Sequence, residues 1–340
     1  MEKKWFEKSG KEGDVVISSR IRLARNLRNI PFPVRMNKQQ KQQIRDEIVQ
    51  AARQSTDPLL RNLTYINMEQ VEKTKAVSMV ENHLVSPDFI ANPVGRGLLV
   101  SKDNSIAVML NEEDHLRIQV MQEGMDLSSV YVLADQIDTA FNSSLHFAFD
   151  NELGYLTQCP TNLGTGMRAS FMLHLPALQQ NGVIKRISDN LSKLGLTLRG
   201  TYGEGTEPVG ALYQLSNQVT LGLSEKEAIE NLERVVLQLV QEERNMRKSL
   251  LENIQQQDTV SRSLGILKSA KILSSEEFMK LLSNVRLGVA CGLFTGISYD
   301  TLNQLMVKTQ PATMMVMQNK QLSAQERDIQ RAQMAAQAFC

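Results

Sequence analysis

The amino-acid sequence predicts an α+β protein, in which an antiparallel sheet flanked by helices is followed by a small all-helical C-terminal domain. Two observations lead to this prediction. Up to about residue 256, short β-like runs alternate with amphipathic helical segments. From Thr259 onward the strand pattern does not recur, while sequence signals for helix starts continue. We therefore expect two domains, over residues 1–255 and 256–340.

The expected strands are joined by short polar turns. Gly97 to Val100 and Ile106 to Leu110 flank the turn Lys102-Asp103-Asn104. Leu145 to Phe149 forms a further β-like run that leads into a polar turn over residues 150–154. Because strands connected by short turns pair antiparallel, the sequence favours an antiparallel sheet with its helices on one face.

Capping boxes mark the expected helices. Ser224 and Glu227 begin a long helix that closes the first domain, and its apolar stripe consists of Ala228, Leu232, Val235, Val236 and Leu239. Two further capping boxes, which predict helices in the C-terminal domain, are Ser274 with Glu277 and Ser323 with Glu326.

Composition excludes some classes of function. Lys and Arg number 38 against 37 Asp and Glu, so no overall field attracts nucleic acid or anionic lipid. The chain has no apolar run long enough to span a bilayer and no signal-like start. Its three cysteines are scattered, which suits a reducing compartment. We expect a cytoplasmic protein with neither direct nucleic-acid nor membrane binding.

The segment Cys159 to Ser170 is the most informative stretch. Gly164 and Gly166 allow backbone N–H groups to approach an anion closely, and the guanidinium of Arg168 adds a charged fork. Cys159 precedes a proline at the start of the turn. Taken alone, the segment is also typical of a loop between strands that carries a buried cysteine.

Three other clusters accompany this segment, namely Ser18-Ser19-Arg20-Ile21-Arg22, Asn111-Glu112-Glu113-Asp114-His115-Leu116-Arg117 and Arg199-Gly200-Thr201-Tyr202-Gly203-Glu204. In the same order along the chain, the four segments resemble the motifs of the ATP:guanidino phosphotransferases, the phosphagen kinase superfamily. The similarity spans roughly Ser18 to Leu223. It implies a catalytic domain of the phosphagen kinase or glutamine synthetase-like type.

A kinase without a P-loop must neutralise the phosphates of ATP with side chains, and arginine is suited to this task. The chain has no Gly-x-x-x-x-Gly-Lys-Ser/Thr motif. By resemblance, the phosphates are clamped by Arg20, Arg22, Arg117, Arg168 and Arg199. The nucleotide site implied by the resemblance comprises, besides these, Ser18, Ser19, Ile21, His83, Ala169, Ser170, Phe171, Met172, Gly200, Thr201, Tyr202, Gly203 and Glu204. The resemblance also implies ATP with Mg²⁺, held mainly by phosphates and water.

The acceptor poses the opposite problem, because a protonated guanidinium is not a nucleophile. The family uses two glutamates to orient and deprotonate it, which match Glu113 and Glu204, and we expect Glu113 to be the base. On a strand, Glu112 and Glu113 would point to opposite faces, which leaves Glu112 as a structural, metal-side or surface carboxylate. Cys159 resembles the family's reactive cysteine, a thiolate that aligns the acceptor nitrogen without forming a covalent intermediate.

The histidines carry a weaker signal. His83 resembles a family histidine near the nucleotide, and a histidine satisfied at a helix end is the alternative. His115, inside the acidic cluster, is expected to be structural.

Two departures from creatine and arginine kinases bear on the substrate. In those enzymes a helical domain precedes the first arginine motif, which begins here at Ser18, and histidine commonly follows the loop glutamate where this chain has Gly205. A site without that substrate-enclosing domain is expected to accept an arginine attached to a protein. These features are similar to those of the bacterial protein-arginine kinases.

A C-terminal motif supports the same resemblance. Arg327-Asp328-Ile329-Gln330-Arg331-Ala332 resembles the Arg-Asp-x-x-Arg-Ala motif of protein-arginine kinases, which implies an allosteric phosphoarginine pocket formed by Arg327, Asp328, Arg331 and Ala332. Arg327 and Arg331 are spaced to share one face of a helix. An ordinary charged helix surface is the alternative.

Three functions stay open at this point. The leading one is transfer of the γ-phosphoryl group of ATP to protein arginine, which marks proteins for the stress response and Clp-type degradation. The others are a phosphagen kinase for free arginine and a phosphoarginine-binding adaptor without turnover. The resemblance also implies an activator protein, a heat-shock repressor and a Clp ATPase or protease as partners, and a homo-oligomer.

Overall fold

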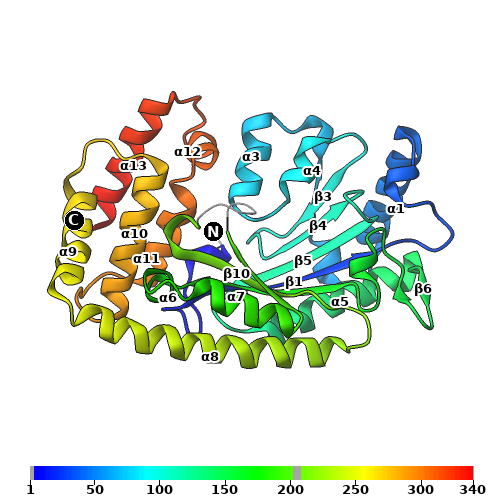
Figure 1. Cartoon of the computed structure of the whole chain (residues 1–340). Helices are drawn as coiled ribbons and strands as arrows, with labels where there is room; N and C mark the ends of the chain where they lie inside the picture. The colour runs from blue at the N-terminus through cyan, green and yellow to red at the C-terminus, as the bar shows by residue number, and fades with distance from the viewer. Residues whose placement is uncertain (1–3, 202–207, 340) are drawn as a thin grey trace.

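A computed structural model describes residues 4–201 and 208–339. Within them, an antiparallel sheet of eight strands runs in the order β2-β3-β4-β5-β1-β8-β10-β9, which confirms the predicted sheet (Figure 1). Its strands are β1 (Val16–Arg25), β2 (Thr64–Asn67), β3 (Gly97–Val100), β4 (Ile106–Leu110), β5 (Leu116–Glu123), β8 (Met167–His174), β9 (Leu196–Gly200) and β10 (Leu212–Asn217). A small separate hairpin pairs β6 (Phe149–Asp150) with β7 (Gly154–Tyr155).

Helices cover one face of the sheet. They are α1 (Lys38–Gln54), α2 (Pro58–Arg61), α5 (Leu127–Leu145), α6 (Pro176–Gln180), α7 (Ile184–Lys193) and the long α8 (Glu225–Leu251). Apolar residues of β1 and β5, such as Leu23 and Ile118, share a core with Ile137 of α5 and Leu232 of α8. Alternate residues of each strand therefore face this core, and the others face the opposite side.

The opposite face is only partly covered. Over the β3–β4 end, α3 (Lys73–Glu81) and α4 (Pro87–Ala91) pack Met79 and Phe89 against Leu98 and Met109. At the far end, C-terminal helices pack on the sheet through a core that includes Met121 of β5 and residues of α9 (Ile254–Ser269), α10 (Ser275–Ala290), α11 (Tyr299–Lys308) and α13 (Ala324–Phe339). A further C-terminal helix, α12 (Pro311–Gln318), packs beside α3. Between these two blocks, the sheet keeps an open polar face.

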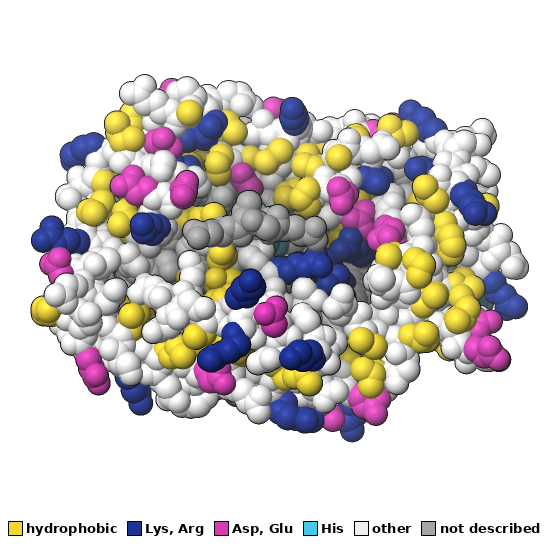
Figure 2. Space-filling view, in the orientation of Figure 1, with side chains coloured by type: hydrophobic (Ala, Val, Ile, Leu, Met, Phe, Trp, Pro, Cys, Tyr) yellow, Lys and Arg dark blue, Asp and Glu magenta, His cyan; other side chains and the backbone are white. Residues whose placement is uncertain are grey.

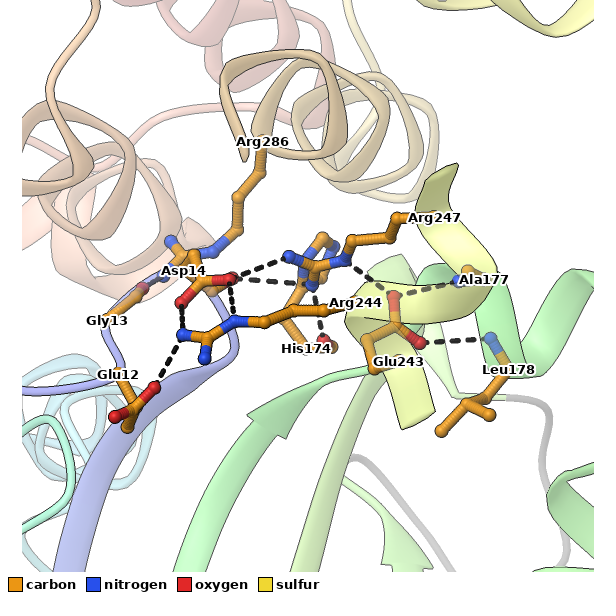
Figure 3. Close-up of polar contacts among 10 residues, drawn as sticks. All are labelled: Glu12, Gly13, Asp14, His174, Ala177, Leu178, Glu243, Arg244, Arg247 and Arg286. Atoms are coloured by element: carbon orange, nitrogen blue, oxygen red, sulfur yellow. Dashed lines mark hydrogen bonds and ion pairs between the residues drawn. The ribbon is translucent and has the colours of Figure 1, made fainter. Parts of the chain in front are cut away.

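A buried ionic network joins the N-terminal segment, α8 and the C-terminal helices (Figure 3). Glu243 of α8 is fully buried, pairs with Arg247 at 2.7 Å and accepts hydrogen bonds from two backbone N–H groups at the start of α6. Asp14 pairs with both Arg244, at 2.6 Å, and Arg247, at 3.3 Å. Arg286 of α10 donates to the carbonyl of Gly13. The carboxylates of this network neutralise the arginines of α8.

The helix predictions agree with the structure, and one strand prediction does not. Ser224 caps α8 in a reciprocal box with Glu227, and Ser323 with Glu326 forms the box at α13. Leu145 to Phe149 is not one continuous strand, because Leu145 ends α5, Phe147 makes an isolated antiparallel bridge to Leu27, and β6 begins at Phe149. The chain passes from α8 to α9 between residues 251 and 254, and the domain boundary near residue 256 stays a prediction.

Candidate active site

Strand register gathers the predicted arginines on the open face of the sheet. Arg22 of β1 lies directly opposite Arg168 of β8, and Arg20 lies two residues along on the same face. Arg117 of β5 is opposite Ala24, again on this face. Arg199 of β9 pairs with Gln214 of β10. All five arginines line one cavity of about 660 Å³, in the hollow where dark blue side chains gather in Figure 2.

The five arginines bring positive charge to this cavity, and none of the described residues that line it carries a carboxylate. Burial and the neighbouring Arg117 and Arg168 lower the pKa of Arg20 to about 9. Burial and the same kind of repulsion lower the pKa values of Arg22 and Arg168. The Nε of Arg22 is buried without a hydrogen-bond partner. Guanidinium groups that repel one another around a polar cavity suit a polyanion, whose phosphate oxygens would satisfy these donors.

Neutral polar side chains hold two of the arginines in place. Arg20 donates through Nε to Ser170 Oγ at 3.2 Å and through Nη2 to Gln214 Oε1 at 2.7 Å. Arg168 donates through Nε to Ser216 Oγ at 3.3 Å. These partners orient the guanidinium groups without cancelling their charge.

A second, smaller cavity of about 160 Å³ adjoins the first. It shares Arg22, Arg117 and Arg168 with the larger cavity, and its other wall consists of Ala24, Glu112, Glu113, Asp114, Cys159, Thr161, Asn162 and Gly166. The arginines thus form a boundary between a cationic chamber and one that carries carboxylates and a thiol. Such a chamber suits a cationic group of small size.

The acidic residues lie in the β4–β5 connection, which corrects the expectation that they lie on a strand. β4 ends at Leu110 and β5 begins at Leu116. The chain turns at Asn111, which has a φ of 58° and whose side-chain amide donates to the carbonyls of Lys41 and Gly95. Side-chain alternation along a strand therefore does not separate the two glutamates, and the turn lets both line the smaller cavity.

Glu112 is a structural carboxylate and not a surface residue. Its side chain is 6% exposed, pairs with Arg117 at 2.5 Å and accepts a hydrogen bond from Ser86. Arg117 and Ser86 hold the pKa of Glu112 below its usual value against the opposing effect of burial. Glu112 thus remains ionised and fixes Arg117 at the boundary of the two cavities.

Glu113 has the opposite electrostatic environment. Burial raises its pKa above the usual value, and the neighbouring charges of Asp114 and Glu112 raise it further. A hydrogen bond with the Cys159 thiol opposes this shift. A carboxylate with a raised pKa is a better proton acceptor, so Glu113 has the properties of a general base.

The cysteine loop is anchored from both sides. Cys159 is half-buried, and its Sγ lies 3.0 Å from Thr161 Oγ1. Gly164 closes the loop with a φ of 96° and donates its N–H to the carbonyl of Leu153. A Cβ at Gly164 would lie 2.2 Å from the carbonyl oxygen of Thr220, so the loop packs too closely there for a side chain.

The histidines occupy different environments. His83 lines the larger cavity, and burial together with Arg20 lowers its pKa to about 4, so the ring is neutral at pH 7. His115 accepts a hydrogen bond from the backbone N–H of Leu27 through Nδ1, and its Nε2 bonds to the carbonyl of Pro31. His115 is therefore structural, as its sequence context predicts.

Not every residue of the predicted nucleotide site reaches the cavity. The residues that line it are Arg20, Arg22, His83, Arg117, Arg168, Arg199, Gly200 and Thr201. Ile21, Ala169 and Phe171 point into the opposite core, and Met172 packs with the C-terminal helices. Ser19 binds the carbonyl of Gly124 instead. Ser18 is buried outside the cavity lining, and Tyr202, Gly203, Glu204 and Gly205 lie outside the described residues.

Sequence reasoning missed several lining residues. They are Val80, Val85, Ser86, Pro87, Met109, Gln119, Gln214 and Ser216. Gln119 could have been found from the sequence, because it lies two residues from Arg117 on the same strand and therefore on the same face. Gln214 and Ser216 likewise lie two residues apart on one strand, where they alternate with apolar residues. The residues from α3 and α4 carry none, since only tertiary packing brings these helices to the sheet.

The C-terminal motif is partly buried. Arg331 is 1% exposed, pairs with Asp328 at 2.7 Å and donates to the carbonyls of Leu273 and Thr309. Arg327 is half-buried and donates to the carbonyl of Leu322. Ala332 belongs to the core of the C-terminal helices. Arg331 therefore holds Asp328 and two loops together, and Arg327 is the more accessible arginine.

Within residues 4–201 and 208–339, no three His, Cys, Asp or Glu side chains group in a way that could hold a metal ion. In the same part of the chain, no helix has the length and apolar character needed to cross a membrane.

Comparison with known proteins gives two family matches. Residues 43–246 match the family described as "ATP:guanido phosphotransferase, C-terminal catalytic domain", and residues 253–340 match "Protein-arginine kinase McsB C-terminal domain". A protein named protein-arginine kinase from Clostridium acetobutylicum is 43% identical over 97% of both chains. Its namesake from Halothermothrix orenii is 44% identical over 97% of this chain and 94% of its own.

Solved structures agree with this result. The duplicated taurocyamine kinase from Schistosoma mansoni, with bound transition state analog components, is 31% identical with a TM-score of 0.61. It covers 68% of this chain, which covers 33% of it. Lombricine kinase is 26% identical with a TM-score of 0.62 and covers 71% of this chain, which covers 69% of it. By fold, site and sequence, the chain belongs to the protein-arginine kinase family of the ATP:guanido phosphotransferases.

Proposed function

We propose that this chain transfers the γ-phosphoryl group of ATP to the guanidino group of arginine side chains in proteins. The observation that carries the proposal is the meeting of two cavities at Arg22, Arg117 and Arg168. A triphosphate in the cationic cavity would place its terminal phosphate at this boundary. A substrate guanidinium in the smaller cavity would face it from the acidic side.

The residues divide the chemistry between them. The arginines bind the phosphates and stabilise charge on the transferring group, as phosphoryl transfer requires. Glu113 orients the guanidinium and accepts the proton that the attacking nitrogen loses as the new P–N bond forms and the bond from the γ-phosphorus to the bridging oxygen breaks. The electron pair of the broken bond leaves with ADP. Cys159, as a thiolate, would help to align the nitrogen.

Two further groups belong to the proposal. Glu204, in the segment beyond Thr201, would be the second carboxylate on the acceptor. The family uses ATP with Mg²⁺, and the ion would neutralise phosphate charge while held mainly by phosphates and water. The cationic lining fits the nucleotide, because the buried Nε of Arg22 has no partner in the protein.

The C-terminal motif and the partners are proposed by family resemblance. A phosphoarginine could place its phosphoryl group against Arg327 and its guanidinium against Asp328, which Arg331 holds in place. Phosphorylation replaces the positive charge of a target arginine, so a repressor that reads DNA with arginines would lose its charge match. An activator, such a repressor and a Clp ATPase or protease would act with this kinase.

The test supplies the chain and MgATP with either an arginine-rich unfolded protein or free arginine. We expect phosphate on the protein that resists alkali and is lost in acid, as the P–N bond requires, and none on free arginine. Label on free arginine would instead favour a metabolic phosphagen kinase. Nucleotide binding without label on either acceptor would favour an adaptor. The Glu113→Gln variant serves as the control for activity of this site.

A further inference from the structure

The last turn of α3 contacts two different parts of the molecule. Val80 and His83 line the larger cavity of the active site. Glu81, between them, faces the C-terminal helix α12, which lies beside α3 (Figure 1). Its Oε1 accepts a hydrogen bond from the N–H of Ala312 at 2.9 Å, and its Oε2 accepts from the N–H and Oγ1 of Thr313 at 2.6 and 2.7 Å.

These bonds cap α12 from outside. Gln310, the N-cap residue of α12, makes no side-chain capping bond. The free N–H groups of the first turn are instead satisfied by the carboxylate of Glu81, which also interacts favourably with the positive end of the helix. Ser78 and Asn82 of the α3 region bond the Thr313 hydroxyl as well, each at 3.2 Å. The contact is thus specific and hydrogen-bonded.

The position of His83 depends on where this turn ends. Its backbone is left-handed with a φ of 58°, which is unusual for a residue other than glycine. Its carbonyl accepts a hydrogen bond from Gln119 at 2.8 Å, and its ring lies 6.1 Å from that of Trp5. A small shift of the turn would therefore move the wall of the cavity next to Arg20.

The turn that leads from α11 into α12 contacts the C-terminal arginine motif. Thr309, two residues before α12, accepts a hydrogen bond from Arg331 Nε at 3.2 Å. Arg331 and His83 are therefore linked through the start of α12 and the side chain of Glu81. Two sites coupled through a packed element influence each other reciprocally.

We infer that Glu81 is a positioning residue of the nucleotide cavity, and that by capping α12 it makes nucleotide affinity depend on the seating of the C-terminal helices. The inference rests on the proposed function in one respect, namely that the larger cavity binds ATP. Glu81 itself does not line the cavity. Its effect on the nucleotide is exerted through Val80 and His83.

The test measures the dissociation constant for ATP by calorimetry in the full chain, together with KM and kcat. Replacing Glu81 by Ala should raise the dissociation constant and KM at least about 5-fold, the usual lower range of coupling between sites, with a smaller change in kcat. Thr313→Val should have the same effect in weaker form. Thr313→Ser, which keeps the hydroxyl that bonds to Glu81, should leave the affinity for ATP at the wild-type value. In a double-mutant cycle, Glu81→Ala and Thr313→Val should be less than additive, because they remove one contact.

Glu72→Gln is the matched control. Glu72 also joins α3 to the C-terminal region, through an exposed 3.3 Å hydrogen bond from Gln321, but at the opposite end of α3 from the cavity. The affinity of the Glu72→Gln variant for ATP should equal that of the wild type. Folded Glu81 and Thr313 variants with wild-type ATP affinity would overturn the inference alone. A wild-type chain that binds no ATP would overturn the proposed function and the inference with it.

Discussion

Two groups of arginines in this molecule, each of them at least partly buried, have opposite electrostatic surroundings. At the junction with the C-terminal helices, Arg244 and Arg247 lie against the carboxylates of Asp14 and Glu243 (Figure 3). On the open face of the sheet, Arg20, Arg22 and Arg168 lie against one another, and their pKa values are lowered. Removal of an arginine from solvent therefore does not by itself identify a binding site. The balance of charge around the arginine is what distinguishes the two groups.

The largest expected effect comes from the unbalanced group. Replacing Arg22 by Ala removes a guanidinium from the boundary of both cavities, where charge would develop in the proposed transfer. We expect kcat/KM for protein-arginine phosphorylation to fall about 10³- to 10⁵-fold, the range for an arginine that stabilises a phosphoryl transition state. The thermal midpoint should stay the same or rise, because the substitution relieves repulsion. A folded variant with wild-type kcat/KM would show that Arg22 does not serve the reaction.

The balanced group should give the reverse result. Glu243→Gln removes the fully buried charge that pairs with Arg247. We expect the free energy of unfolding to fall by about 3–5 kcal/mol, because the buried guanidinium of Arg247 loses its closer and fully buried partner and keeps only Asp14, at 3.3 Å. Activity per folded molecule should remain near that of the wild type at low temperature. Denaturant unfolding followed by an activity assay measures both.

Glu230→Gln on the same helix is the control for this variant. Its ion pair with Lys226 is solvent-exposed, at 57% and 84% side-chain exposure, and should contribute less than about 1 kcal/mol. Equal destabilisation by the two substitutions would contradict the structural role given to the buried network.

The sequence predicts much of this fold because local signals and packing agree. The capping box at Ser224 and the hairpin turn over residues 102–104 both correspond to the observed elements. The predicted strand from Leu145 to Phe149 is instead divided, because Leu145 ends α5, Phe147 bridges to Leu27 and Phe149 begins β6. Short apolar runs do not distinguish a helix end from a strand, and tertiary contacts decide.

The site was predictable to a different extent. The arginines were found through motif resemblance, and strand register explains why alternate positions such as Arg20 and Arg22 converge. The strand assumption for Glu112 failed because the turn at Asn111 depends on hydrogen bonds to Lys41 and Gly95, which are distant in sequence. The burial of Arg331 likewise could not be predicted from the sequence, because the side chain is held by backbone carbonyls, which every residue has.

Nucleotide binding should distinguish the two arginine groups again, with a smaller effect. A ligand that binds only the folded state at 100 times its dissociation constant stabilises it by about 2.7 kcal/mol. We expect ATP to stabilise the wild type and the Glu243→Gln variant by this amount. The Arg22→Ala variant should lose this stabilisation. Thermal shift at increasing ATP concentration measures it. An undiminished shift in the Arg22→Ala variant would place the nucleotide elsewhere.

The smallest effect concerns pH and the carboxylates that face the arginines. Burial, then Asp114 and Glu112, raise the pKa of Glu113. Only ionised Glu113 can accept a proton, so kcat should fall as pH drops through this raised pKa, and at most about tenfold for each further unit. Below it, the carboxyl is protonated and the acceptor guanidinium keeps its proton.

Asp114→Asn sharpens this prediction, because it removes one of the negative neighbours. The asparagine keeps an oxygen that can accept the hydrogen bonds from Asn26 and the N–H of Gln158. With less repulsion, the pKa of Glu113 should fall, and the acid limb of the kcat–pH profile should move to lower pH while the plateau stays similar. A limb that moves to higher pH, or does not move, would exclude Glu113 as the titrating base. In that case Glu113 would not be the base that faces the arginines, and another carboxylate would have to accept the proton from the acceptor guanidinium.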